Sequence, residues 1–175
     1  LPGAATKLAV TRASAGIVNR VAFTTQPQVT VQDADGNTVT TSTASIGVTS
    51  SVGNGATLSG TTPSTAASGV ATFAGLKLTG LVGDYTLTYA STGLTATETV
   101  TLLPGAANKL ALTTSAAGAV NRAAFTTQPV VTIQDADGNT VTSSTAEVSV
   151  TSSVGNGATL SGTSPVSAAS GVATF

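Results

Sequence analysis

The chain has 175 residues, of which 41% are hydrophobic and only 7% are charged, and its formal net charge is −1. A charge balance this close to neutral offers no electrostatic surface for nucleic acid or for an anionic membrane. The sequence holds no Cys and no His. It therefore excludes disulfides, zinc sites built from thiolates or imidazoles, and Ser-His-Asp or Cys-His catalytic groups within this chain. No apolar run reaches the roughly 20 residues of a membrane span, so membrane insertion is not expected.

Alternation with period two dominates the first hundred or so residues and predicts β-strands. In one clear case, Tyr85, Leu87 and Tyr89 share one face while the two threonines between them take the other. Val and Thr, which strands favour, are abundant, and Gly and Pro punctuate the chain at short intervals. We therefore expect strands near residues 7–11, 20–25, 28–33, 38–41, 45–50, 56–60, 69–73, 76–79, 84–90 and 94–101.

Residues 1–73 recur as residues 103–175 without a gap, at a constant offset of 102. The two copies differ at 16 of the 73 aligned positions and are identical at the other 57. Some differences, such as Val31 against Ile133, exchange one aliphatic side chain for another, as buried positions tolerate. A period of this length matches one β-sandwich domain and is too long for a solenoid unit.

We expect two domains, residues 1–102 and residues 103–175, the second lacking counterparts of residues 74–102. Without that segment the second domain would expose apolar faces and unpaired strand edges. We favour a fragment cut from a longer chain; the alternative is that a neighbouring molecule supplies the missing strands. The linker Leu103-Pro104-Gly105-Ala106-Ala107 is short and Pro104 limits bending, so successive domains are expected to lie nearly end to end.

The most acidic stretch, Gln32-Asp33-Ala34-Asp35-Gly36-Asn37, occurs again at residues 134–139. A helix-loop-helix calcium site needs Gly at its sixth position and a bidentate carboxylate at its twelfth. Counted from the first Asp, those positions hold Thr38 and Ala44. Asp-Gly between two alternating runs is instead typical of a hairpin turn, where Gly36 adopts a positive φ. A looser calcium site at the domain junction is the alternative, with candidate ligands Asp33, Asp35, Asp135 and Asp137.

Lysine chemistry offers one further hypothesis. Lys7, Lys77 and Lys109 are candidates for a cross-link to an Asn side chain, assisted by a buried acid. Glu98 is the candidate acid, because alternation places it on the apolar face of its strand. The alternative interpretations are an inward charge that blunts an edge strand, or a bulge that turns the side chain outward.

Three other features are weaker indications of function. Tyr85 follows a probable strand start, as in the tyrosine corner of immunoglobulin-like sandwiches, or is simply a core aromatic. A row of alternating threonines could order water or ice, although Thr is also an ordinary exposed strand residue. The row comprises Thr95, Thr97, Thr99 and Thr101. Gly53-Asn54-Gly55 precedes a predicted strand, which argues against a phosphate cradle at a helix start.

Several motifs of the repeat are similar to those of a known family. They are Lys7-Leu8, Phe23-Thr24-Thr25-Gln26-Pro27, the stretch from Val29 to Asn37, Ala56-Thr57-Leu58-Ser59-Gly60, Gly69-Val70-Ala71-Thr72-Phe73 and Tyr85-Thr86-Leu87-Thr88. Together they resemble tandem bacterial immunoglobulin-like repeats, which occur in long secreted and surface proteins such as invasin-like adhesins. The resemblance implies an all-β fold of tandem immunoglobulin-like antiparallel β-sandwiches. It implies an extracellular, cell-surface setting and no catalytic residues.

On this basis we expect a non-catalytic spacer, or stalk, in a surface adhesin or fibre, with neighbouring copies of the same repeat as partners and no cofactor beyond the calcium alternative. The runner-up is a homopolymer, a filament subunit assembled by strand exchange or lateral packing. A carbohydrate-binding or ice-binding module is a further alternative. Sugar platforms usually present exposed aromatic side chains, and this chain has two Tyr, four Phe and no Trp.

Overall fold

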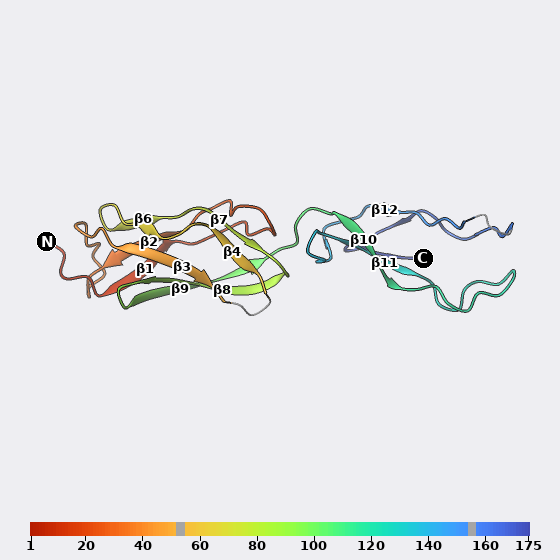
Figure 1. The fold of residues 1–175 in the computed structure, drawn as a ribbon, viewed down its shortest axis with the longest axis horizontal. Helices are drawn as coiled ribbons and strands as arrows, with labels where there is room; N and C mark the ends of the chain where they lie inside the picture. Colours follow the sequence, from red (N-terminus) through yellow and green to blue (C-terminus); the bar gives the residue numbers. More distant parts are fainter. Residues whose placement is uncertain (52–54, 154–156) are drawn as a thin grey trace. The chain divides into compact units, whose positions relative to one another are not determined.

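The computed structural model describes residues 1–51, 55–153 and 157–175 and divides into two compact units. Unit 1 comprises Leu1–Leu103 and unit 2 comprises Pro104–Phe175. The described residues contain strands and turns but no helix, as Figure 1 shows. Consequently none of them forms a helix that is long and apolar enough to cross a membrane. The fold is all-β, as the sequence predicts.

Unit 1 is built from strands that pair only in antiparallel fashion. They are β1 (Lys7–Arg12), β2 (Gln28–Gln32), β3 (Ser45–Ser50), β4 (Thr57–Thr61), β5 (Ser64–Thr65), β6 (Val70–Thr72), β7 (Ala74–Thr79), β8 (Gly83–Ser91) and β9 (Leu94–Leu102). One sheet has the order β1-β2-β6, a second has the order β5-β3-β8-β9, and β4 pairs with β7. The hairpin β8–β9 is the longest ladder, running from Gly83 opposite Leu102 to Ser91 opposite Leu94.

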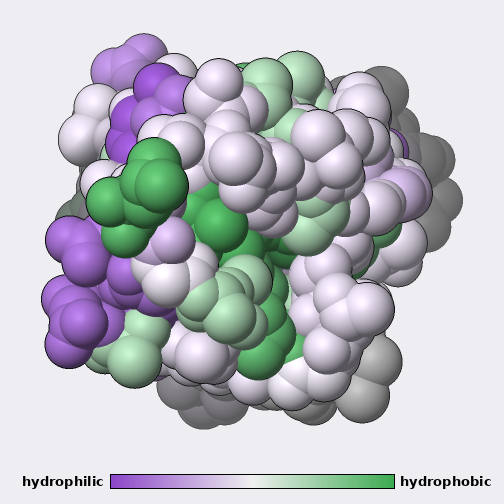
Figure 2. Space-filling model, turned by 90° about the vertical axis from the view of Figure 1, so that its left-hand side faces the viewer, coloured by the Kyte–Doolittle hydropathy of each residue, from purple (hydrophilic) through white to green (hydrophobic). Residues whose placement is uncertain are grey.

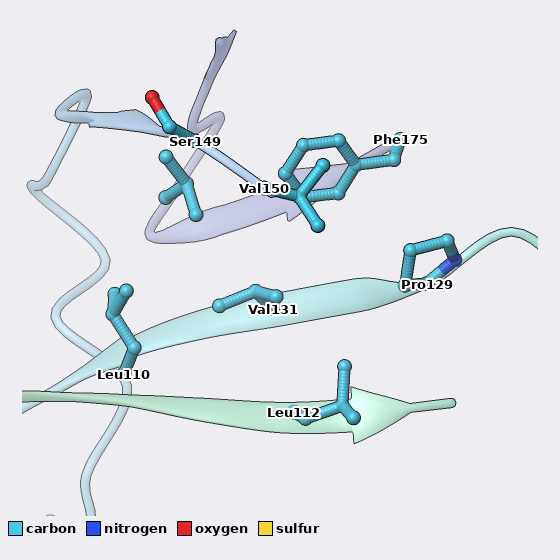
Figure 3. Close-up of a pocket in the computed structure, with 8 residues that line it drawn as sticks. Leu110, Leu112, Pro129, Val131, Ser149, Val150 and Phe175 are labelled. Carbon is cyan, nitrogen blue, oxygen red and sulfur yellow. The ribbon is translucent and has the colours of Figure 1, made fainter. Parts of the chain in front are cut away.

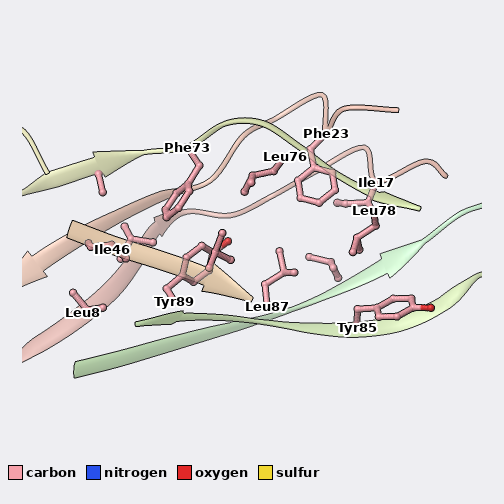
Figure 4. Close-up of a cluster of buried hydrophobic side chains, with 14 of the residues drawn as sticks. Leu8, Ile17, Phe23, Ile46, Phe73, Leu76, Leu78, Tyr85, Leu87 and Tyr89 are labelled. Atoms are coloured by element: carbon pink, nitrogen blue, oxygen red, sulfur yellow. The ribbon is translucent and has the colours of Figure 1, made fainter. Parts of the chain in front are cut away.

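Side chains from these sheets meet in one core, which Figure 4 shows. The alternation of β8 explains its part in that core, because Tyr85, Leu87 and Tyr89 are fully buried. The ring of Tyr89 packs against Phe73 with the centroids 5.3 Å apart and the planes tilted by 54°, within the range that aromatic pairs prefer. In β2, Val29 and Val31 are buried on the core side.

Two predicted strands are wrong, those near residues 20–25 and 38–41. Arg20 has a φ of 67°, which breaks an extended backbone. The N–H of Arg20 donates to the carbonyl of Leu78 at 3.0 Å, and the N–H of Phe23 donates to the carbonyl of Leu76 at 2.9 Å. This segment therefore runs alongside β7 as a loop and not as a strand. The second segment makes only an isolated bridge between Gln32 and Thr38 before the chain turns. The two-residue strand β5 is too short for alternation to reveal.

Unit 2 repeats part of this arrangement. Its strands are β10 (Lys109–Thr114), β11 (Val130–Gln134), β12 (Glu147–Val148), β13 (Val166–Ser167) and β14 (Val172–Thr174). The order β10-β11-β14 corresponds to β1-β2-β6, and Leu110 opposite Ile133 reproduces the register of Leu8 opposite Val31. Its core is smaller, and β12 has two residues where β3 has six.

Candidate functional site

The acidic stretch of unit 1 forms a turn held together by one carboxylate. Asp33 Oδ1 accepts hydrogen bonds from the N–H groups of Asp35 and Asn37 at 3.1 and 2.8 Å. Its Oδ2 accepts from the Asn37 side chain at 3.1 Å and from the N–H of Gly3 at 2.8 Å. Gly36 has a φ of 89°, as the turn interpretation predicts. The N–H of Gly3, followed by the other donors, lowers the pKa of Asp33 to about 2.

The second copy of the turn has the same geometry. Asp135 is buried and accepts from the N–H groups of Asp137 and Asn139, each at 3.0 Å, and from the Asn139 side chain. It also accepts from the N–H of Gly105 at 2.9 Å, the counterpart of the Gly3 contact. Each turn therefore acts as a clasp: its first aspartate holds the glycine of the Leu-Pro-Gly segment that begins its own copy. The sequence gives no signal for this contact, because the two partners lie 30 residues apart.

Of the four candidate calcium ligands, two are thus already occupied by backbone and amide donors. Asp35 is exposed, and Asp137 is partly buried. The structure brings no group of three or more carboxylates together in its described part. The geometry favours the turn over a calcium site, because both oxygens of each clasp aspartate already serve the fold.

Glu98 points inward from β9, and the unbroken β8–β9 register contains no bulge that would turn it out. Its Oε1 accepts hydrogen bonds from the Ser14 hydroxyl at 2.6 Å and from the Tyr89 hydroxyl at 2.5 Å, and its Oε2 accepts from the N–H of Ser14 at 3.0 Å. Burial, reinforced by the neighbouring carboxylate, raises the pKa of Tyr89 well above its usual range. Ser14 escaped sequence reasoning because it lies outside any alternating segment. Its counterpart in unit 2 is Ala116.

The three lysines considered for a cross-link are all exposed. Lys7 donates to the carbonyl of Ala34 in the acidic turn at 3.3 Å. The hydrogen-bond partners of Glu98 are Ser14 and Tyr89. The structure thus supports the interpretation of Glu98 as an inward charge on the edge strand β9. None of the three lysines is among these hydrogen-bond partners of Glu98.

Tyr85 combines both roles considered for it. Its ring is buried, with 1% of the residue exposed, and its hydroxyl donates to the carbonyl of Leu81 at 2.7 Å. A hydrogen bond back to the backbone a few residues upstream is the feature of a tyrosine corner. Burial raises the pKa of Tyr85.

The outer face of β8–β9 carries the threonine row. Thr95, Thr97, Thr99 and Thr101 are all exposed. Across the ladder, Thr99 lies opposite Thr86 and Thr97 lies opposite Thr88. The aromatic side chains of unit 1 are buried instead, so none of them is exposed to stack against a sugar ring. Figure 2 looks onto the end of unit 1 that carries the N-terminus and shows mostly residues of intermediate hydropathy, with strongly hydrophilic residues grouped on one side.

Of the glycine-rich stretch Gly53-Asn54-Gly55, the first two residues lie outside the described part of the chain. Gly55 has a φ of 74°.

Comparison with known proteins gave a limited set of similarities. No protein-family model matches the chain, and no curated protein matches it. Among solved structures, the chain is similar to domains 5–6 of the S-layer protein SbsC, with 18% identity and a TM-score of 0.43 over 86% of this chain and 73% of that chain. It is also similar to InvD of Yersinia pseudotuberculosis, with 22% identity and a TM-score of 0.45 over 80% of this chain. It spans 45% of the InvD chain.

Proposed function

We propose that the chain is a non-catalytic structural repeat of a bacterial surface adhesin or fibre, in which it acts as a rigid extracellular spacer. Its partners in this proposal are neighbouring copies of the same repeat, whose number sets the reach of the parent protein. The extracellular setting rests on the resemblance of the repeat to bacterial immunoglobulin-like repeats. In this proposal each unit folds around its own core, and the linker fixes where the next unit begins, so the number of units sets the length of the spacer.

The observation that carries the proposal is the way in which the linker is held. The N–H of Leu103 donates to the carbonyl of Ile17 at 2.9 Å, and the carbonyl of Leu103 accepts from the N–H of Asn19 at 2.9 Å, both within unit 1. Within unit 2, Gly105 is held by Asp135. Only Pro104 lies between these anchored residues, and its ring fixes φ. We therefore expect this linker to bend little, because the one residue between its anchors is a proline.

The path of the chain through unit 1 also suits a load-bearing role. Figure 1 shows the N-terminus at one end of unit 1 and the chain leaving from the other. At the first end Gly3 is held by Asp33, and at the second the last residues of β9 are paired with the start of β8. Force along the chain therefore loads the strand ladders in shear, so that many hydrogen bonds resist together.

Two buried or half-buried acids of unit 1, Asp33 and Glu98, and both of its tyrosines are hydrogen-bonded within the fold, which supports a non-catalytic role. Asp33 and Glu98 accept several hydrogen bonds each, and both tyrosine hydroxyls donate to acceptors within the unit. A catalytic acid or base needs a proton-transfer partner from the substrate within hydrogen-bond reach. The hydrogen bonds of these groups are made to neighbouring residues of the same unit.

Inter-unit distances measured by pulsed electron spin resonance test the proposal. The chain has no Cys, so spin labels at Thr97→Cys in unit 1 and Thr142→Cys in unit 2, both exposed positions, are unique. We expect a narrow distance distribution that broadens in Asp135→Ala, which releases Gly105, and in Pro104→Gly. Asp33→Ala is the matched control, because it removes the same clasp away from the linker and should leave the width unchanged. A broad distribution in the unmodified chain would contradict the proposal.

A second candidate function, a filament subunit that exchanges strands with its neighbours, is favoured by the shortened β12 of unit 2. Sedimentation over a range of concentrations separates the two candidates. A spacer keeps the mass of one chain, whereas a filament subunit grows with concentration and returns to single chains on dilution.

A further inference from the structure

Unit 2 presents an apolar groove, shown in Figure 3, with a volume of about 290 Å³. Figure 3 shows Leu110 and Leu112 of β10 on one side, Val150 and Phe175 on the other, and Val131 of β11 between them. Leu110 is 58% exposed and Leu112 is 59% exposed. Several large aliphatic side chains exposed together on one face mark a surface that a partner covers.

Unit 1 shows what covers the same face in the first copy. Leu8, the counterpart of Leu110, is only 6% exposed, and Val48 and Phe73, the counterparts of Val150 and Phe175, are buried. The covering element is the hairpin β8–β9. Its Tyr89 lies opposite Val48 in the strand ladder and packs against the ring of Phe73, while β9 contacts β1. The sequence following Phe73 supplies this hairpin in unit 1.

The backbone of unit 2 points to the same kind of occupant. In unit 1, residues 47–50 of β3 pair with β8. Their counterparts, residues 149–152, form no strand within the described part of unit 2, although β12 just before them pairs with β13 as β3 pairs with β5. A strand edge beside an apolar groove is the arrangement that binds an added strand, with backbone hydrogen bonds giving affinity and alternate side chains filling the groove.

We propose that this open face of unit 2 binds a β-hairpin with the sequence pattern of Gly83–Leu102. In the first strand of the hairpin, every second residue is a large apolar side chain, as in Tyr85, Leu87 and Tyr89. The register of unit 1 places the second of these tyrosines opposite Val150 and against Phe175. This inference depends on the fold of unit 2 and not on the spacer function.

The test uses the whole chain, isotope-labelled, and a synthetic peptide with the sequence of Gly83–Leu102. We expect saturable binding, with amide-exchange protection appearing at residues 149–152 and shift changes at Leu110 and Leu112. The double variant Leu110→Thr/Leu112→Thr removes apolar surface at exposed positions and should weaken binding about tenfold or more. Val120→Thr is the matched control, since Val120 is 65% exposed and does not line the groove. It should bind as the unmodified chain does.

Three results would overturn the inference. One is the absence of saturable protection at residues 149–152. Another is equal binding of a control peptide in which Tyr85, Leu87 and Tyr89 are replaced by threonine. The third is protection of the groove without any peptide in a dimer whose population rises with concentration, because the occupant would then be a second copy of the open face.

Discussion

Leu8 and Leu110 occupy the same position of the repeat in very different surroundings, so truncating each to alanine separates burial from residue type. Leu8 is 6% exposed in the core of unit 1, whereas Leu110 is 58% exposed in unit 2. Truncating a buried leucine costs roughly 2–5 kcal/mol, because the lost transfer free energy is joined by the cavity left behind. At Leu110, water fills the space that the truncated side chain leaves, and less than half of the leucine surface was buried before the substitution. We therefore expect Leu110→Ala to cost less than about 1 kcal/mol.

Urea denaturation measures both substitutions in the full chain. Both tyrosines lie in unit 1, so tyrosine fluorescence follows that unit alone, and amide exchange at β10 and β11 follows unit 2. Leu8→Ala should lower the midpoint of the fluorescence transition without a comparable change in its slope. Comparable costs at the two positions would refute the reasoning, since they would mean that the groove of unit 2 is already covered in solution.

Three further predictions concern hydrogen bonds and charge. Tyr85→Phe leaves the carbonyl of Leu81 without its 2.7 Å hydrogen-bond donor and should lower the free energy of unfolding by roughly 1–3 kcal/mol. A loss below measurement error in urea titrations would mean that the tyrosine corner contributes nothing to stability. Because folding lowers the pKa of Asp33 from 3.8 to about 2, its stabilising effect is present above pH 3.8 and is lost as the pH falls through about 2. Asp33→Asn should therefore flatten the acid limb of unit 1 unfolding, and an unchanged limb would argue against the clasp. Folding raises the pKa of Tyr89 above its usual value of 10.0, so unit 1 should lose stability as the pH rises past that value. Phenolate absorbance should then appear together with loss of the β-sheet circular dichroism signal. Formation of the Tyr89 phenolate while unit 1 stays folded would contradict this prediction.

The strands that sequence alone could locate are those in which one face is buried and the other carries threonine. β8 and β9 are the clearest, because burial of one face imposes the period of two that the sequence shows. The segment near residues 20–25 looked similar but its backbone groups are satisfied by β7, a tertiary contact that leaves no periodic mark.

The contacts that define the candidate site were harder to predict, because they join residues far apart in the chain. Alternation singled out Glu98, yet nothing local indicated Ser14, which lies 84 residues away. The turn at Asp33 was predictable from Asp-Gly, whereas its hold on Gly3 was not. Local patterns constrain backbone conformation, and long-range side-chain contacts follow only from the assembled fold.

Pulling on single molecules shows whether this chain bears load along its length. The substitutions Leu1→Cys and Leu103→Cys place the pulling points at the two chain ends of unit 1. Cysteines at the paired residues Asp84 and Thr101 would instead separate β8 from β9 one hydrogen-bonded pair at a time. In the first pulling geometry, unit 1 should unfold cooperatively at a clearly higher force than the hairpin does in the second. Its unfolding should release roughly 300 Å of chain, given about 3.3–3.6 Å per extended residue. Rupture at an equal or lower force in the first geometry would contradict it.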